Sequence, residues 1–242
     1  MHITTLLVDV CAGVKKVQPR CVEDGITYID IGANVGKVYD ELSKQIPVNE
    51  ARLIEAHPTL AGYCSNKYEN DKNVIVENFA AGNTTQDVRF NACDLNLQSK
   101  TDENGKTMYS EPGWNLGVSS VWVGGKTTVQ MRSISEWLSQ NSHLYTDVSL
   151  IKIDTENQDL FILESLEEVI DKFEHDPIIS FEVNWFYEPL DNVKAIFEKY
   201  NTKKYKAVSW LRQPVVVESP YDFIGTSIRD GYLVSEDTLQ LL

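Results

Sequence analysis

The sequence predicts a single α/β domain built on a doubly wound, largely parallel, Rossmann-like sheet. Short apolar runs alternate with segments of helical periodicity over residues 28–80, in the order strand, helix, strand, helix, strand. The same alternation returns at residues 149–200 after an interruption. No repeat, low-complexity tract or linker divides the 242 residues, so we expect one domain over 1–242, with 1–25 as a lead-in of undetermined structure.

Composition excludes several classes of partner. The chain has 36 acidic and 22 basic residues and a formal net charge of -14. This balance argues against nucleic acid and against an anionic membrane surface, since both bind through Lys and Arg. No apolar run approaches the roughly 18 residues of a membrane helix. The four cysteines show no CxxC spacing and indicate free thiols, so we expect a cytoplasmic protein without membrane insertion.

The first strand leads into a glycine turn and a helix. Tyr28–Ile31 is an apolar run, Gly32–Gly36 is the turn, and the helix that follows stops before Pro47. This geometry brings backbone N–H groups close to a ligand. The dinucleotide pattern G-x-G-x-x-G is absent, and Asp30 at the strand end would repel a phosphate but favour an amine or a sulfonium. The stretch therefore favours S-adenosylmethionine over a dinucleotide.

The remaining elements follow in order. Residues 51–56 form a second strand, which ends at His57-Pro58, and Thr59 is the expected N-cap of the next helix. A third strand runs from Val74 to Ala80. Later strands are expected at 149–154, 178–183, 205–210 and 215–217, the last two as a hairpin, with helices at 160–173 and 190–200.

An interruption at residues 84–132 is longer than a connection requires and is expected to be functional. Residues 120–123 and 127–131 flank Gly124-Gly125-Lys126, which predicts an antiparallel hairpin over the acceptor site. Ser133-Ile134-Ser135-Glu136 then forms a capping box at a helix start.

Polar residues gather at the predicted carboxyl ends of the strands, where doubly wound sheets bind ligands. Glu55 lies nineteen residues after Gly36 and is the expected partner of a ribose diol. The expected cofactor residues are Asp30, Gly32, Ala33, Asn34, Gly36, Glu55, Ala56, Asn78, Ala80 and Asp154.

Three carboxylates are candidates for the chemistry: Asp154, Glu156 and Glu182. They could take a proton from an acceptor hydroxyl, or together hold a Mg²⁺ that acidifies it, and the sequence does not decide between these roles. His57 is a further candidate base, against a structural role beside Pro58. Trp114 and Trp185 suit the flat face of a sugar ring, although aromatic residues equally fill cores.

Several motifs together resemble the FkbM family of S-adenosylmethionine-dependent methyltransferases. They are Tyr28–Gly36, Ile54-Glu55-Ala56-His57-Pro58, Ser133–Leu138 and Ile151-Lys152-Ile153-Asp154-Thr155-Glu156, with the Ser119-Ser120 pair as a further family feature. The resemblance implies a class I fold of seven strands with an antiparallel last strand, and O-methylation, often of a sugar hydroxyl. It places Asp30, Gly32, Asn34 and Gly36 at the methionine part and the segment after the third strand at the adenine.

One position departs from the family pattern. Asn157 stands where the family usually has glycine, and Asn is the next best residue at a positive φ. We therefore expect the turn to survive with a changed acceptor pocket. The predicted partners are S-adenosylmethionine and a carbohydrate acceptor, with the oligomeric state open. The alternatives are a non-catalytic glycan-binding or scaffolding module that keeps the fold, and a dinucleotide-dependent oxidoreductase.

Overall fold

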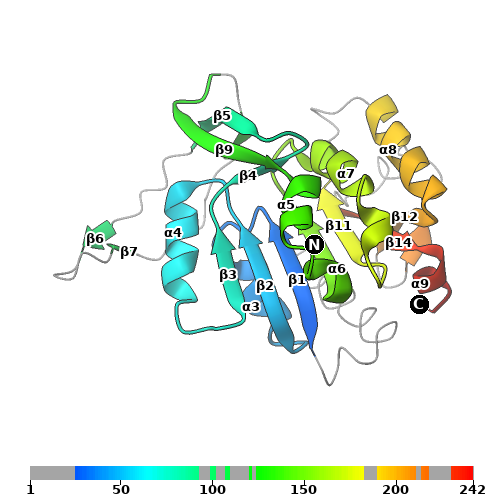
Figure 1. The fold of residues 1–242 in the computed structure, drawn as a ribbon, viewed down its shortest axis with the longest axis horizontal. Helices are drawn as coiled ribbons and strands as arrows, with labels where there is room; N and C mark the ends of the chain where they lie inside the picture. The colour runs from blue at the N-terminus through cyan, green and yellow to red at the C-terminus, as the bar shows by residue number, and fades with distance from the viewer. Residues whose placement is uncertain are drawn as a thin grey trace.

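A computed structural model of the chain describes residues 25–92, 99–101, 107–109, 120–121, 124–182, 190–210, 214–217 and 230–241. Its centre is an eight-stranded sheet in the order β13-β12-β14-β11-β10-β1-β2-β3 (Figure 1). The strands are β1 (Ile26–Ile31), β2 (Val48–Ile54), β3 (Val74–Glu77), β10 (Val148–Ile153), β11 (Ile178–Glu182), β12 (Tyr205–Trp210), β13 (Pro214–Val216) and β14 (Asp230–Ser235). The predicted mostly parallel α/β sheet is confirmed, but it has eight strands where seven were expected.

Helices cover both faces of this sheet. One face carries α3 (Lys37–Leu42), α4 (Pro58–Lys67) and α9 (Glu236–Leu241). The other carries α5 (Ile134–Gln140), α6 (Leu144–Asp147), α7 (Asp159–Glu167) and α8 (Leu190–Thr202), with a short 3-10 helix at Ile170–Lys172. Strand β1 shows why both are needed. Tyr28 packs into the first layer and Ile29 into the second, because successive side chains of a strand point to opposite faces. Every residue of β1 is buried, as expected for a central parallel strand.

The antiparallel part of the sheet differs from the prediction. The hairpin of β12 and β13 is confirmed, with Val208 opposite Val216. The strand that runs antiparallel inside the sheet is β14, which follows both in the chain but lies between β11 and β12. Its sequence, Asp-Gly-Tyr-Leu-Val-Ser, opens on a turn signal and gave no strand prediction. Tyr232, Leu233 and Val234 are all buried there, so packing on both faces of the sheet stabilises this short strand.

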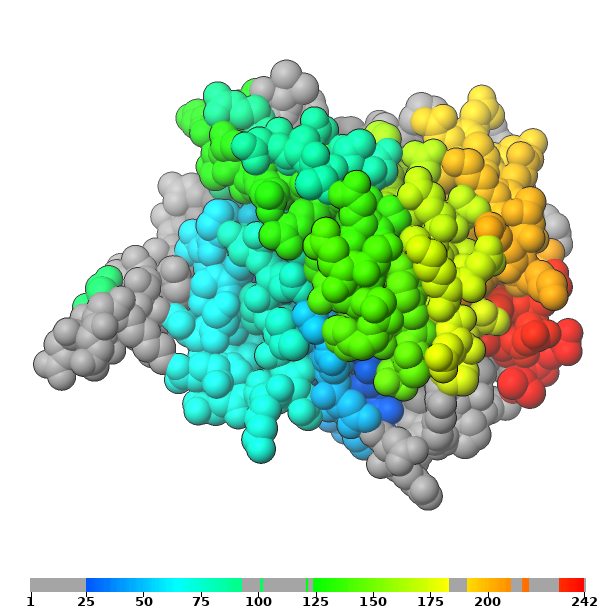
Figure 2. Space-filling view, in the orientation of Figure 1, coloured from blue at the N-terminus to red at the C-terminus, as the bar shows by residue number. Residues whose placement is uncertain are grey.

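The predicted third strand is wrong at its end. Strand β3 stops at Glu77, and Ala80–Gly82 forms β4 in a separate sheet. This sheet, which we call the accessory sheet, has the order β4-β9-β5-β8 and also contains β5 (Gln86–Asn91), β8 (Ser120–Val121) and β9 (Thr127–Ser133). It lies across the carboxyl ends of β1, β2 and β3 in Figure 1, and its atoms lie at the upper left of the face shown in Figure 2.

The predicted hairpin within this sheet is also wrong. Strands β8 and β9 do not pair with each other: both pair with β5, Val121 and Thr127 lying opposite Phe90 from its two sides. The connection must therefore cross β5. Gly125 makes the crossing possible, because a Cβ there would lie 2.5 Å from the backbone carbonyl carbon of Phe90. Gly124 and Gly125 suggested a hairpin turn, but Gly125 is required because its backbone lies close to that of β5.

Two smaller features complete the described chain. Strands β6 (Ser99–Thr101) and β7 (Thr107–Tyr109) pair with each other as a two-stranded ribbon. Ser133 caps α5 as predicted by accepting a hydrogen bond from the Glu136 N–H, but the Ser133 N–H donates to Thr85 Oγ1, not to Glu136. No helix among the described residues is long and apolar enough to cross a membrane.

The crossing at Gly125 can be tested by substitution. Gly125→Ala should lower the free energy of unfolding by about 1–3 kcal/mol, because the new methyl group cannot fit against the β5 backbone. Gly124→Ala, at the exposed neighbouring position, should change it by less than about 0.5 kcal/mol. Urea denaturation of both variants measures the difference, and equal midpoints would contradict the crossing.

Candidate functional site

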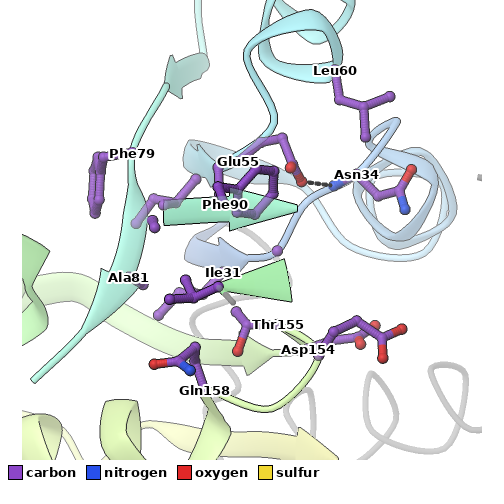
Figure 3. Close-up of a pocket in the computed structure, with 16 residues that line it drawn as sticks. Ile31, Asn34, Glu55, Leu60, Phe79, Ala81, Phe90, Asp154, Thr155 and Gln158 are labelled. Carbon is purple, nitrogen blue, oxygen red and sulfur yellow. Dashed lines mark hydrogen bonds between the residues drawn. The ribbon is translucent and has the colours of Figure 1, made fainter. Parts of the chain in front are cut away.

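A cavity of about 140 Å³ lies between the carboxyl ends of β1, β2 and β10 and the accessory sheet (Figure 3). Among its walls are seven residues predicted for the site: Gly32, Asn34, Glu55, Ala56, Ala80, Asp154 and Glu156. An apolar set completes much of the lining: Ile31, Ile54, Leu60, Phe79, Phe90 and Val121. The cavity thus combines acidic and polar groups with an apolar lining.

The glycine turn is held by close packing. Gly32 and Gly36 have positive φ angles of 79° and 72°. A Cβ on Gly32 would lie 1.9 Å from the carbonyl oxygen of Asp154, and one on Gly36 would lie 2.2 Å from the Tyr68 hydroxyl. Only glycine meets both demands, the left-handed backbone and the contact.

The N–H groups of this turn are bonded inside the protein. Those of Gly32 and Ala33 donate to the Ile54 carbonyl, and that of Gly36 donates to the Ala33 carbonyl. The Asn34 N–H donates to Glu55 Oε2 at 2.7 Å. Four of the five amides in residues 32–36 therefore have protein acceptors, and the turn is not the open amide cradle that binds phosphates.

Glu55 joins the turn to the end of β2. It is 6% exposed, and its second oxygen, Oε1, accepts from the His57 N–H at 2.8 Å. Burial raises the pKa of this carboxyl, and the two backbone hydrogen bonds oppose the shift. Asn78 does not line the cavity; its Nδ2 donates to the Glu55 carbonyl at 2.7 Å and fixes the strand end from behind.

Asp30 lies behind the cavity wall, not in it. It is fully buried, opposite Lys152 in the register of β1 and β10, and its Oδ1 accepts from Lys152 Nζ at 3.0 Å. The same ammonium group donates to the Gly32 carbonyl at 3.2 Å and lies 3.4 Å from Asp154 Oδ2. Burial lowers the pKa of Lys152, but Asp30 and Asp154 outweigh it and the pKa is raised. A direct contact of Asp30 with a cofactor stays a prediction.

The turn after β10 has an unusual backbone. Glu156 and Asn157 have φ angles of 50° and 81°, so the expected left-handed turn at Asn157 is confirmed. Asp159, the first residue of α7, is 3% exposed and accepts from both the N–H and the hydroxyl of Thr155 at 3.2 Å. This carboxylate fixes the strained turn against the cavity.

His57 has a structural contact that competes with a role as base. It is 5% exposed, and its Nδ1 accepts from the Thr59 N–H at 3.2 Å, so His57 caps α4 and the prediction of Thr59 as N-cap is wrong. Its ring lies edge-on to Phe90, with centroids 6.2 Å apart. An Nδ1 that accepts an N–H is unprotonated, which leaves Nε2 as a donor in the neutral ring.

The predicted metal ligands do not form a set. Asp154 and Glu156 line the cavity, whereas Glu182, the last residue of β11, does not. In the described ranges no three His, Cys, Asp or Glu side chains converge as metal ligands. These donors do not fit a Mg²⁺ site. Trp114, Ser119 and Trp185 lie outside the described residues, and Ser120 is the first residue of β8.

Other site residues were not predicted from the sequence. Thr155 and Gln158 line the cavity, Lys152 and Asp159 hold it from behind, and Phe90 and Val121 reach it from the accessory sheet. A signal existed for Lys152, since a lysine inside an apolar strand requires a buried counter-charge. No such signal existed for Phe90. The alternation of its strand predicts that Phe90 faces inward but does not show which site that face covers.

The left-handed turn provides a stability test. Asn157→Ala should lower the free energy of unfolding by about 1 kcal/mol, because a left-handed residue with a Cβ and no local polar group is strained. Asn157→Gly should equal or exceed the parent protein in stability, since glycine adopts this φ freely. Thermal unfolding compares the pair, and an alanine variant as stable as the glycine variant would contradict strain at this position.

Comparison with solved structures gives the same fold. The methyltransferase FkbM from Methylobacillus flagellatus KT matches with a TM-score of 0.50 and 15% identity, covering 86% of this chain and 43% of that protein. This chain therefore spans less than half the length of that relative. Precorrin-6y C5,15-methyltransferase from Geobacter metallireducens GS-15 matches with a TM-score of 0.43 and 12% identity, covering 92% of this chain and 83% of that protein. Fibrillarin from Aeropyrum pernix, bound to S-adenosylmethionine, matches with a TM-score of 0.42 and 11% identity, covering 86% of this chain and 65% of that protein.

Comparison with curated protein sequences found no match to the chain, whereas comparison with protein families found one. The model of the methyltransferase FkbM domain matches residues 30–205, which begin at Asp30 and include the glycine turn, Glu55, the accessory sheet and the turn after β10. That span is well over half of the chain, and it carries the described walls of the cavity. The chain belongs to the FkbM family of methyltransferases.

Proposed function

We propose that this chain is an S-adenosylmethionine-dependent O-methyltransferase that acts on a hydroxyl of a carbohydrate. The charge of the cavity carries the proposal. Three carboxylates, Glu55, Asp154 and Glu156, line it, and no Lys or Arg is among its described lining residues. A ligand with a sulfonium and an ammonium group complements such a cavity, because low local dielectric strengthens these interactions.

The same features oppose a dinucleotide. A pyrophosphate binds through free backbone N–H groups at a helix start or through basic side chains. Here the N–H groups of Gly32, Ala33, Asn34 and Gly36 already have protein acceptors. Lys152, the lysine that adjoins the described part of the site, is already paired with the buried Asp30. An oxidoreductase that uses a nicotinamide dinucleotide is therefore disfavoured.

Glu55 is the proposed partner of the cofactor ribose. Its two oxygens are fixed by the Asn34 and His57 N–H groups, and each carboxylate oxygen retains a lone pair for a ribose hydroxyl. The glycine turn and Asp154 border the neighbouring part of the cavity, where the methionine part would lie. Bound S-adenosylmethionine would supply the electrophilic methyl group.

Asp154 is the proposed proton acceptor. Its side chain is 42% exposed, whereas Glu55 is 6% exposed, so Asp154 lies toward solvent and toward an entering acceptor. Lys152 holds Asp154 Oδ2 at 3.4 Å and restricts the orientation of the carboxylate. In this role Asp154 removes the proton of the acceptor hydroxyl while the acceptor oxygen gains the methyl group.

A carbohydrate acceptor fits the polar groups at this end. Asp154, Glu156 and Gln158 offer carboxylate and amide oxygens, which accept hydrogen bonds from neighbouring hydroxyls. A sugar presents several such hydroxyls at once. Membership of the family and this row of acceptors support the proposal.

Cofactor binding should depend on Glu55 and on pH. Wild-type protein should bind S-adenosylhomocysteine 1:1 in isothermal titration calorimetry, and Glu55→Gln should weaken binding about 10- to 100-fold, the range for a hydrogen bond to a charged group. An ordinary glutamate has a pKa of about 4.3. The pKa of Glu55 is raised, so as the pH is lowered its carboxylate should gain a proton, and wild-type affinity should fall, at a pH above that value. Glu55→Gln should lack this dependence. No binding by wild type at millimolar ligand would refute the proposal.

Methyl transfer should depend on Asp154. An acceptor screen of free sugars, glycosides and non-sugar alcohols with labelled methyl donor should label sugars. With an acceptor identified in this screen, Asp154→Asn should lower kcat about 10²- to 10⁴-fold, as expected for loss of a general base. Asp87→Asn, an exposed acid of β5 away from the cavity, should leave kcat unchanged. Full activity of Asp154→Asn, or label on non-sugar alcohols alone, would contradict this assignment.

A further inference from the structure

The accessory sheet presents an apolar cluster to the main sheet. Ala80, Phe90, Val129 and Met131 are buried together, and Ala56 packs against them. Ala56 directly follows the proposed ribose residue Glu55. The accessory sheet thus contacts the main sheet at the part of the cavity next to the ribose, although the sequence had assigned this region to the acceptor.

Phe90 is the central residue of this contact. It is 2% exposed and lines the cavity together with Glu55 (Figure 3). Its ring lies edge-on to His57, whose own N–H donates to Glu55 Oε1. A chain of two contacts therefore fixes the distance between an aromatic ring and the carboxylate proposed to hold the ribose.

The backbone around Phe90 is fixed as well. Val121 and Thr127 pair opposite it on the two sides of β5, and Gly125 crosses against its backbone. Val121 also lines the cavity. The crossing thus brings a second apolar side chain to the same wall, and Phe90 is held between strands on both sides of β5.

We propose that Phe90 and Val121 form the wall that contacts the nucleoside part of the cofactor, so the accessory sheet determines affinity for the adenosyl group. This inference rests on the proposed function, since it takes Glu55 as the ribose partner. A nucleobase has flat apolar faces, and aromatic or aliphatic side chains next to the ribose carboxylate suit them. The insertion is then part of the cofactor site.

The test uses two ligands that share the nucleoside. Calorimetry compares S-adenosylhomocysteine with 5′-methylthioadenosine, which lacks the amino-acid part, on wild type, Phe90→Leu and Val121→Ala. The matched control is Val88→Ala, because Val88 lies on β5 and packs on the same cluster but does not line the cavity. Thermal unfolding of each variant confirms that it is folded under the conditions of titration.

Phe90→Leu and Val121→Ala should each weaken both ligands by the same factor, about 5- to 10-fold, as expected for loss of an aromatic or aliphatic contact. Val88→Ala should change neither by more than about twofold. Unchanged affinity in both wall variants, or an equal loss in Val88→Ala, would overturn the inference. Loss for S-adenosylhomocysteine alone would place the wall at the methionine part and overturn it too. Failure of wild type to bind either ligand would instead refute the proposed function.

Discussion

The contact between Gly32 and the carbonyl of Asp154 is the constraint on which the site depends. Because Gly32 has no Cβ, the ends of β1 and β10 approach closely enough for one ammonium group, that of Lys152, to reach Asp30, the Gly32 carbonyl and Asp154. The N–H of Asp154 also donates to the Ile31 carbonyl, so a backbone hydrogen bond joins the two strand ends. Any side chain at position 32 would separate these strands and open the base of the cavity.

The charges around this contact have separate purposes. Asp30 is fully buried and the side chain of Lys152 is only 12% exposed, and removing one partner of a buried ion pair typically costs about 3–5 kcal/mol. This pair therefore stabilises the register of β1 and β10, in which Asp30 lies opposite Lys152. Three carboxylates, Glu55, Asp154 and Glu156, line the cavity, and the ammonium group of Lys152, which pairs with Asp154, is shared with Asp30. The proposed cofactor, with its sulfonium and ammonium groups, would add positive charge to this acidic lining.

Sequence patterns predicted the elements whose signals are local. The apolar runs of β1 and β2, the glycine turn and the left-handed Asn157 were all found in this way. Features that depend on which strands become neighbours were missed. Asp30 and Lys152 are 122 residues apart in the chain, and their contact exists only because β10 pairs with β1. Gly125 illustrates the same limit: a glycine required by backbone contact has the same local pattern as one required by a turn.

The position of β14 has a consequence for how the protein is made. This strand separates β11 from β12, and all three are adjacent only after residues 230–235 have left the ribosome. Until then, β11 and β12 each present an unpaired edge, and unpaired edges favour pairing with other chains. The described residues that line the cavity end at Gln158, and Asp159, at the start of α7, fixes the turn beside them. The described walls of the cavity are therefore all synthesised before β11, β12 and β14, whereas the other half of the sheet is complete only once β14 has been made.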